Sequence, residues 1–397
     1  MTLHPADRLA FDRAMVTQPV WNRFNTAAEA LNLRPNVLLH SGSAFAEANQ
    51  ITLPILNSAC VAAVYEGIAR DFDQAEAMIL AGEINLEPAQ DHDVVTPLAA
   101  VVSASMPLHA VYDAWGGTQR VYAPINGGSR PAMRLGLRSE AVLEHIRWLN
   151  TRFVDVLQNG LAEGIALVPL AGIGLAGGDD CHGRTPVAGA ALAAELLDRS
   201  PNGITDENAL EFLHSSPSLF LNLWMAATKL MMKQAEGIEG SSFVTAAGGN
   251  GREAAIQISG LSGKWFTVAA DAPKGMFDVD LPIDRALGAI GDSAVVDVFG
   301  LGAMAIELSP EQKSGLGAYL PENAQARKSG LSVGAHPYFQ NMNISLGSTA
   351  RGVVAQGAGP FISLGILDRE GIAGRLGGGI YDMPVTPFSD ALKALDK

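Results

Sequence analysis

The sequence predicts a multi-domain protein of mixed α/β to α+β class, with a helical middle section and a glycine-rich sheet domain at the C-terminal end. Three observations support this prediction. The chain has 397 residues, more than one hydrophobic core usually serves. Short apolar runs alternate with helical patterns in its first third, and after Gly237 short β-branched runs are separated by glycine. We therefore expect domains at residues 1–135, 136–240 and 241–397.

The N-terminal domain is expected to be α/β. A helix-prone polar segment at 5–33 precedes a short buried strand at 36–40, which leads into a Ser-Gly-Ser turn. Apolar residues at helical spacing predict a helix over 55–70, and acids in a first helical turn mark a second helix from Asp73. Small residues at 99–107 then permit close backbone approach.

The middle and C-terminal sections differ in pattern. Helical spacing at 139–157 and 206–234 flanks a glycine-rich interval that contains the most polar cluster of the chain. Runs at 242–245, 254–258 and 265–268 predict an antiparallel or mixed sheet.

Composition excludes several classes of protein. Hydrophobic residues make up 48% and charged residues 17% of the chain, which predicts a globular fold. The 41 acidic against 27 basic residues give a net charge of -14, which disfavours nucleic acid and anionic membrane as partners. The N-terminal residues lack a signal-peptide pattern, and no window has about 18 apolar residues, so we expect a cytoplasmic protein. Cys60 and Cys181 provide neither a disulfide framework nor a metal-binding pair.

The strongest candidate site is the Gly-Asp-Asp-Cys-His-Gly-Arg loop. Asp179 or Asp180 can orient His182 as a general acid or base, and Arg184 can bind a carboxylate or phosphate. The alternative is structural, because the same acids can cap the helix that follows.

A formal match to a dinucleotide-binding fingerprint lies at residues 172–177, after a possible strand at 165–170. With 43 glycines in the chain, such matches are expected by chance, and Pro169 interrupts the strand that the motif requires. The motif therefore identifies no cofactor.

A second polar loop surrounds His92, between Asp91 and Asp93. These residues could orient a base, or bind a metal together with Asp179 and His182 if the two loops converge. A solvated turn is the alternative.

Other polar residues could line an anion site. A glycine-rich turn contains Asn250 and Arg252, and such turns expose backbone amides. Asn222 lies among large apolar residues of a predicted helix, so it needs hydrogen-bond partners. Asp292 and Ser293 introduce an apolar stretch. A plain β-turn, a structural fastener and a helix cap are the respective alternatives.

The chain resembles a family of domains of unknown function that includes a subunit of bacterial oxamate carbamoyltransferase, an enzyme of anaerobic allantoin degradation. The resemblance extends over nearly the whole chain, in the segments 58–62, 65–67, 102–107, 133–136, 178–182, 220–223, 291–294 and 377–379. Family members tend to carry a Cys-His-His-type run after the proline equivalent to Pro88. Here that run reads Ala-Gln-Asp-His and keeps only His92.

The resemblance implies a transferase subunit for which carbamoyl phosphate and a small amide or ureido acid, such as oxamate, are the substrates. Arg134 and Arg184 are then candidates to bind departing phosphate, and His182 or His92 to act as base. The family also implies a multi-subunit assembly with a subunit resembling succinyl-CoA synthetase. The many small residues suit close packing against partners or another copy, so we also expect a homo-oligomer. Two alternatives stay open: a metal-assisted hydrolase or lyase of a ureido or amide compound, and a non-catalytic assembly subunit.

Overall fold

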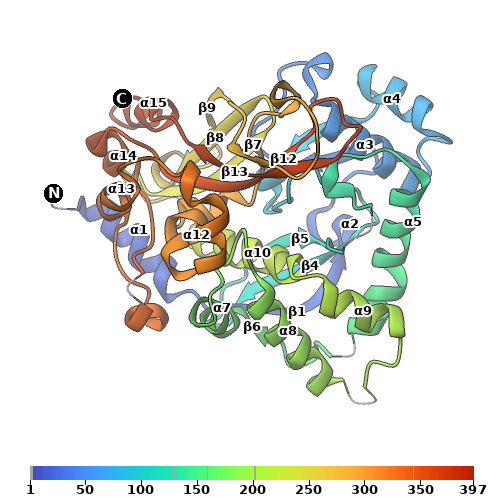
Figure 1. Cartoon of the computed structure of the whole chain (residues 1–397), viewed down its shortest axis with the longest axis horizontal. Coiled ribbons are helices and arrows are strands. Elements are labelled where there is room, and N and C mark those ends of the chain that lie inside the picture. The colour runs from blue at the N-terminus through green and yellow to red at the C-terminus, as the bar shows by residue number, and fades with distance from the viewer. Residues whose placement is uncertain (1–2, 129–130, 159, 201–202, 343) are drawn as a thin grey trace.

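The computed structural model describes residues 3–128, 131–158, 160–200, 203–342 and 344–397, in which helices surround several separate sheets (Figure 1). The α-helices are α1 Pro5–Val16, α2 Ala27–Leu31, α3 Leu53–Tyr65, α4 Phe72–Leu80, α5 Glu140–Trp148, α6 Val154–Gln158, α7 Leu167–Ala176, α8 Pro186–Arg199, α9 Glu207–Ser215, α10 Ser218–Gln234, α11 Ala294–Val298, α12 Pro310–Leu316, α13 Ala324–Leu331, α14 Ala350–Gln356 and α15 Thr386–Leu395. The strands are β1 Pro19–Thr26, β2 Val37–His40, β3 Asn85–Pro88, β4 Pro107–Asp113, β5 Arg120–Pro124, β6 Ile165–Ala166, β7 Val244–Asn250, β8 Glu253–Ile258, β9 Phe266–Ala269, β10 Lys274–Phe277, β11 Ile290–Gly291, β12 Phe361–Leu367 and β13 Arg375–Asp382. The predicted mixed fold class is confirmed.

The N-terminal part contains an antiparallel sheet in the order β5-β4-β1-β6 and a parallel pair, β2 and β3. Helices α3 and α4 connect β2 to β3, since parallel strands need a crossover. Ten of the thirteen residues of α3 are buried, because the helix is apolar on all sides. The α/β opening expected from the sequence is therefore present.

The C-terminal part contains two antiparallel sheets, in the orders β11-β7-β8-β9 and β10-β13-β12. Glycine permits the close pairing of β10 with β13. A Cβ atom on Gly377 would lie 1.8 Å from the carbonyl oxygen of Met276. The hairpin formed by β12 and β13 passes above α10 (Figure 1).

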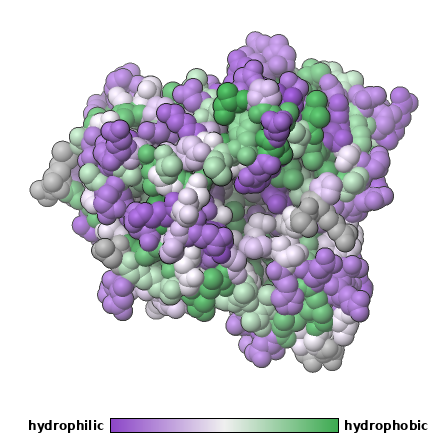
Figure 2. All heavy atoms as spheres, in the orientation of Figure 1, coloured by the Kyte–Doolittle hydropathy of each residue, from purple (hydrophilic) through white to green (hydrophobic). Residues whose placement is uncertain are grey.

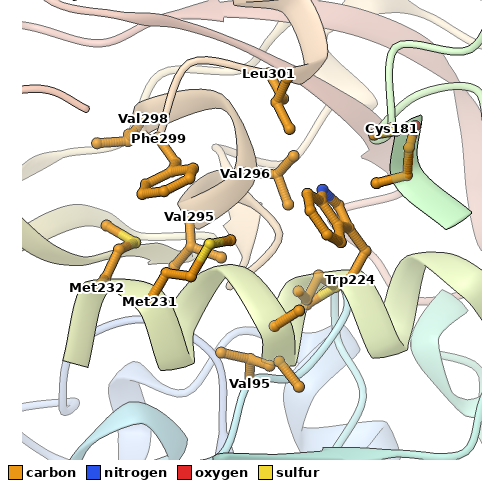
Figure 3. Packing of buried hydrophobic residues seen from close by; sticks show 14 of the residues in the cluster. Val95, Cys181, Trp224, Met231, Met232, Val295, Val296, Val298, Phe299 and Leu301 are labelled. Atoms are coloured by element: carbon orange, nitrogen blue, oxygen red, sulfur yellow. Dashed lines mark hydrogen bonds between the residues drawn. The ribbon is translucent and has the colours of Figure 1, made fainter. Parts of the chain in front are cut away.

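Helix α10 is the central element of the core. Thirteen of its seventeen residues are buried, so the helix is enclosed rather than amphipathic. Trp224, Met231 and Met232 project from α10 towards Val296 and Phe299 in and beside α11 (Figure 3). The N-terminal end of α10 is thereby fixed beside the cavity described below.

Two local predictions are corrected. The run at 165–170 forms a strand only at Ile165–Ala166, and the rest begins α7, so Gly172 and Gly174 of the fingerprint-like run lie inside a helix and Gly177 caps its end. They permit close packing, since a Cβ on Gly174 would lie 2.8 Å from that of Ala188. The glycines before Asn250 belong to buried strand β7 rather than to an open turn, and a Cβ on Gly248 would lie 2.5 Å from Asp292 Oδ1.

In the described part of the chain, no helix is both long and apolar enough to cross a bilayer. The domain boundaries at 135 and 240 stay predictions. Trp21, Trp224 and Phe388, which come from the three expected domains, belong to one continuous buried cluster.

Candidate functional site

A cavity of about 670 Å³ opens between the N-terminal loops, the start of α10 and the C-terminal sheet. In Figure 2, which has the orientation of Figure 1, the surface is hollowed near the middle of the face in view. From α10, Ser218, Leu221 and Asn222 line the cavity, which their helical spacing allows. Among the residues proposed from sequence, Arg134, His182, Arg184, Asn222 and Ser293 line it.

His182 is held at the cavity wall by an acid from a distant segment. Its Nδ1 pairs with Oδ2 of Asp297 on α11, and the hydroxyl of Ser363 lies 3.3 Å from the same nitrogen. Oδ1 of Asp297 accepts hydrogen bonds from the amides of Ala303, at 2.7 Å, and Ser363, at 3.1 Å. Because Asp297 engages Nδ1, Nε2 is the ring nitrogen left for a ligand.

The electrostatic environment favours a protonatable imidazole. Burial lowers the pKa of His182, but the charge of Asp297 and its hydrogen bond outweigh burial, so the pKa is raised. This is the arrangement in which a carboxylate fixes the tautomer of a general base and stabilises the imidazolium that forms.

The two acids before His182 support the loop and do not line the cavity. Oδ2 of Asp179 accepts the amide of Ala188 at 2.8 Å, in the first turn of α8. Oδ1 of Asp180 accepts the amides of His182 and Arg184 at 2.8 and 2.9 Å. Burial raises the pKa of Asp180 to about 6. Both acids therefore bind backbone amides, as the structural alternative expects, and only Asp180 contacts His182, through its backbone amide.

The loop backbone is also strained. Cys181, directly before His182, has a φ of 62°, and Leu98 on the cavity wall has a φ of 47°. Non-glycine residues seldom adopt this left-handed region, and such residues concentrate at binding sites. Cys181 faces Trp224 in the core (Figure 3), so packing holds this conformation.

Arg134 and Asn222 meet at a shared neighbour. Arg134 Nη1 donates to Asn126 Oδ1 at 2.8 Å, and Asn222 Nδ2 donates to the carbonyl of Asn126 at 2.9 Å. Burial, and secondarily the charge of Arg375, lowers the pKa of Arg134 to about 10. Arg184 instead pairs with exposed Glu311 at 2.6 Å.

Asp292 is a buried structural residue that connects three segments of the chain. Its carboxylate accepts hydrogen bonds from Gly42, Gln90 and Thr96, at 2.7 to 3.1 Å. Burial raises its pKa to about 6. Asp292 joins three loops, whereas neighbouring Ser293 reaches the cavity wall.

Three further candidates lie away from the cavity lining. His92 Nε2 lies 2.7 Å from Glu87 Oε2, Asn250 Nδ2 donates to the carbonyl of Ser43 at 2.9 Å, and Arg252 is exposed. The structure does not bring His92 to the His182 loop, and the described residues contain no group of three His, Cys, Asp or Glu side chains that could hold a metal.

The sequence interpretation missed Asp297, Ser363, Arg375 and the cavity-lining Ser216. The available signal for Asp297 was an acid inside the apolar stretch Ala294–Val298, since a buried carboxylate needs partners. Ser363 and Arg375 had no comparable signal.

Comparisons place the chain among known proteins. The model of the family "Oxamate carbamoyltransferase subunit AllG" matches residues 84–293. The protein of that name from Escherichia coli is 32% identical over 378 residues, which cover 90% of this chain and 88% of that protein. Uncharacterized protein YahG from the same organism is 28% identical, over 98% of this chain and 84% of that protein. A crystal structure of a conserved protein of unknown function from Enterococcus faecalis has a TM-score of 0.89 and 25% identity, covering 98% of this chain and 97% of that one.

Proposed function

Because the chain belongs to the family of the oxamate carbamoyltransferase subunit AllG, we propose that it is a subunit of an enzyme that transfers a carbamoyl group between phosphate and a small amide acid such as oxamate. The observation that carries the proposal is the Asp297–His182 pair at the wall of a cavity that three arginines also line. Such a site can bind two anions and move one proton.

The reaction needs few groups from the protein. The amide nitrogen of the acid attacks the carbamoyl carbon of carbamoyl phosphate, the bond from that carbon to the phosphate oxygen breaks, and the nitrogen loses a proton. Nε2 of His182 accepts the proton, and Asp297 stabilises the resulting imidazolium. Arg184 lies beside His182 in the sequence and lines the same cavity, so it is our candidate to neutralise the leaving phosphate.

The start of α10 adds donors for that phosphate. The hydroxyl of Ser216 is buried, lines the cavity and has no hydrogen-bond partner among the described residues. Ser218 begins a helix of seventeen residues, whose dipole favours an anion at this end. The amides of Leu219 and Phe220 already donate to the carbonyls of Ser216 and Pro217. We therefore propose that phosphate binds between Arg184 and the start of α10.

The test is carbamoyl transfer, and its reverse, phosphorolysis of the ureido acid. Both are measured with the purified chain alone and after co-expression with the products of neighbouring genes. His182→Ala should lower the rate by about 100-fold or more, while His214→Ala, at an exposed position, serves as the matched control. Absence of turnover in every mixture would refute the proposal and leave the assembly-subunit alternative.

His92→Ala separates the metal-assisted alternative. If His182 acts without His92, this variant keeps its activity. Loss of activity in both histidine variants, together with stoichiometric metal in the purified active protein, would favour the hydrolase or lyase instead.

A further inference from the structure

We propose that Arg134 and Arg375 form the carboxylate-binding end of the cavity and receive the carboxylate of a small amide or ureido acid. This inference rests on the proposed function, and it assigns a role to Arg375, which the sequence interpretation did not single out.

Arg134 is a cation without a counter-ion. Its guanidinium donates to two neutral oxygens, Oδ1 of Asn126 at 2.8 Å and the carbonyl of Gly128 at 3.4 Å. No carboxylate of the described residues forms an ion pair with it, although the structure contains many such pairs elsewhere, including one for Arg184. A guanidinium in a partly desolvated position is costly unless a negative charge compensates it. A bound carboxylate supplies that charge.

Arg375 brings a second positive charge to the same wall. It begins β13, lines the cavity, and forms an ion pair with Asp278, which also lines the cavity. Its charge acts on Arg134, because it lowers the pKa of that residue in addition to the effect of burial. Two arginines that repel each other at one cavity wall attract an anion between them.

Glycine makes the room that the ligand needs. A Cβ atom on Gly378 would lie 3.3 Å from Arg375 Nη2, and one on Gly365 would lie 3.9 Å from Arg375 Nε and 3.3 Å from a methyl group of Leu98. Both glycines line the cavity. The space beside the guanidinium is therefore open because these two positions lack side chains.

Strand β12 sets the distance between this end and His182. Ser363, beside His182, and Gly365, beside Arg375, lie two residues apart and so face the same side of the strand. At a rise of about 3.4 Å per residue these positions are about 7 Å apart. A small linear acid whose carboxylate lies at the arginines can thus present its amide nitrogen towards the imidazole.

The donor geometry favours a carboxylate over phosphate at this end. Arg134 has five N–H donors in one plane, and its two recorded bonds leave donors for a planar, bidentate partner. Leu98, Leu135 and Leu364 supply apolar walls, which suit a flat organic acid. The single unpartnered hydroxyl of Ser216 does not offer this planar pair of donors, and we assign it to phosphate.

Calorimetry on the full-length chain tests the assignment without turnover. The probes are oxamate, its neutral analogue oxamide, and inorganic phosphate. Oxamate should bind at least about 30-fold more tightly than oxamide, because the charge-assisted contacts are lost with the carboxylate. Arg134→Gln and Arg375→Gln should each weaken the binding of oxamate by about 10-fold or more. The affinity of each variant for phosphate should stay within about 3-fold of the wild-type value. Arg369→Gln, an exposed arginine of the same hairpin, is the matched control.

Two results would overturn the assignment. One is equal affinity of the wild-type chain for oxamate and oxamide. The other is an Arg134 variant in which phosphate binding is weakened as much as oxamate binding. If Arg134→Gln shows no cooperative melting transition and so does not fold, the oxamate affinity of Arg375→Gln becomes the test. The Arg375 side chain is half-exposed, so its replacement should leave the fold intact. In the active assembly, the same variants should raise KM for the ureido acid and not for phosphate. Arginine-dependent oxamate binding without any carbamoyl transfer would refute the proposed function and leave this inference standing.

Discussion

Replacement of Asp368 by asparagine should destabilise the hairpin that carries Ser363 and Arg375. Asp368 begins the connection between β12 and β13, and its fully buried carboxylate forms a bidentate pair with Arg285, at 2.8 and 2.6 Å. It also accepts three backbone amides of the turn, those of residues 370, 372 and 373, at 2.8 to 3.1 Å. Asparagine keeps the shape and removes the charge that all five donors share.

The magnitude follows from the pKa of this carboxyl. Burial raises the pKa, but the bonds from Arg285 and the turn amides outweigh burial and lower the pKa from 3.8 to about 2. At about 1.4 kcal/mol per pH unit, this difference corresponds to about 2.5 kcal/mol of stability. Because the folded-state pKa is depressed, the contribution is fully present above about pH 4 and is lost as the pH falls towards 2.

Urea unfolding from pH 7 down to pH 3 measures the effect. Asp368→Asn should lower the free energy of unfolding by about 2 to 3 kcal/mol at pH 7, and the difference from wild type should narrow below about pH 4. Asp390→Asn, whose partner is the exposed Lys393, should cost less than about 1 kcal/mol. A loss below that value for Asp368→Asn, or a difference that does not change with pH, would refute this reasoning.

Three further outcomes are expected. Asp297→Asn should lower the pKa of His182, so the rise of kcat/KM with pH should occur at lower pH, and kcat should fall by about 100-fold. An unchanged pH profile would contradict the assignment of His182 as the base. Gly377→Ala should lower Tm by several degrees, because the added Cβ would lie 1.8 Å from the carbonyl oxygen of Met276, and an unchanged Tm in differential scanning fluorimetry would show that β10 yields freely. Glu311→Gln should change stability by less than about 1 kcal/mol, since its carboxylate is exposed; a larger loss in urea unfolding would mean that this ion pair fastens α12.

The sequence predicted most elements whose pattern is local. The strands near 244 and 254 and the helices around α3 and α10 follow from apolar periodicity, which acts over a few residues. The possible strand at 165–170 is mostly helix, because a short apolar run fits a buried strand and a buried helix equally well. Strand β7 extends through its glycines to Asn250 because Gly248 and Gly249 pack against neighbouring loops, contacts that no local pattern contains.

The site divides in the same way. The His182 loop stood out because five reactive side chains lie in a few residues, and His182 and Arg184 of this loop line the cavity. Asp297 lies 115 positions from His182, and Ser363 lies 181 positions away, so only the folded chain shows these neighbours. Asp292 was a candidate because it introduces an apolar stretch, and in the structure its carboxylate binds Gly42, Gln90 and Thr96.

The cavity wall draws on residues from Pro97 to Gly378, so its lining spans most of the chain. Such a site cannot exist on a nascent fragment, because the wall closes only after the last hairpin has left the ribosome and paired. A ligand that binds there acts by mass action on the finished molecule alone. Protection of the chain against proteolysis by such a ligand would therefore show that synthesis and folding are complete. The same ligand would not protect a truncated chain.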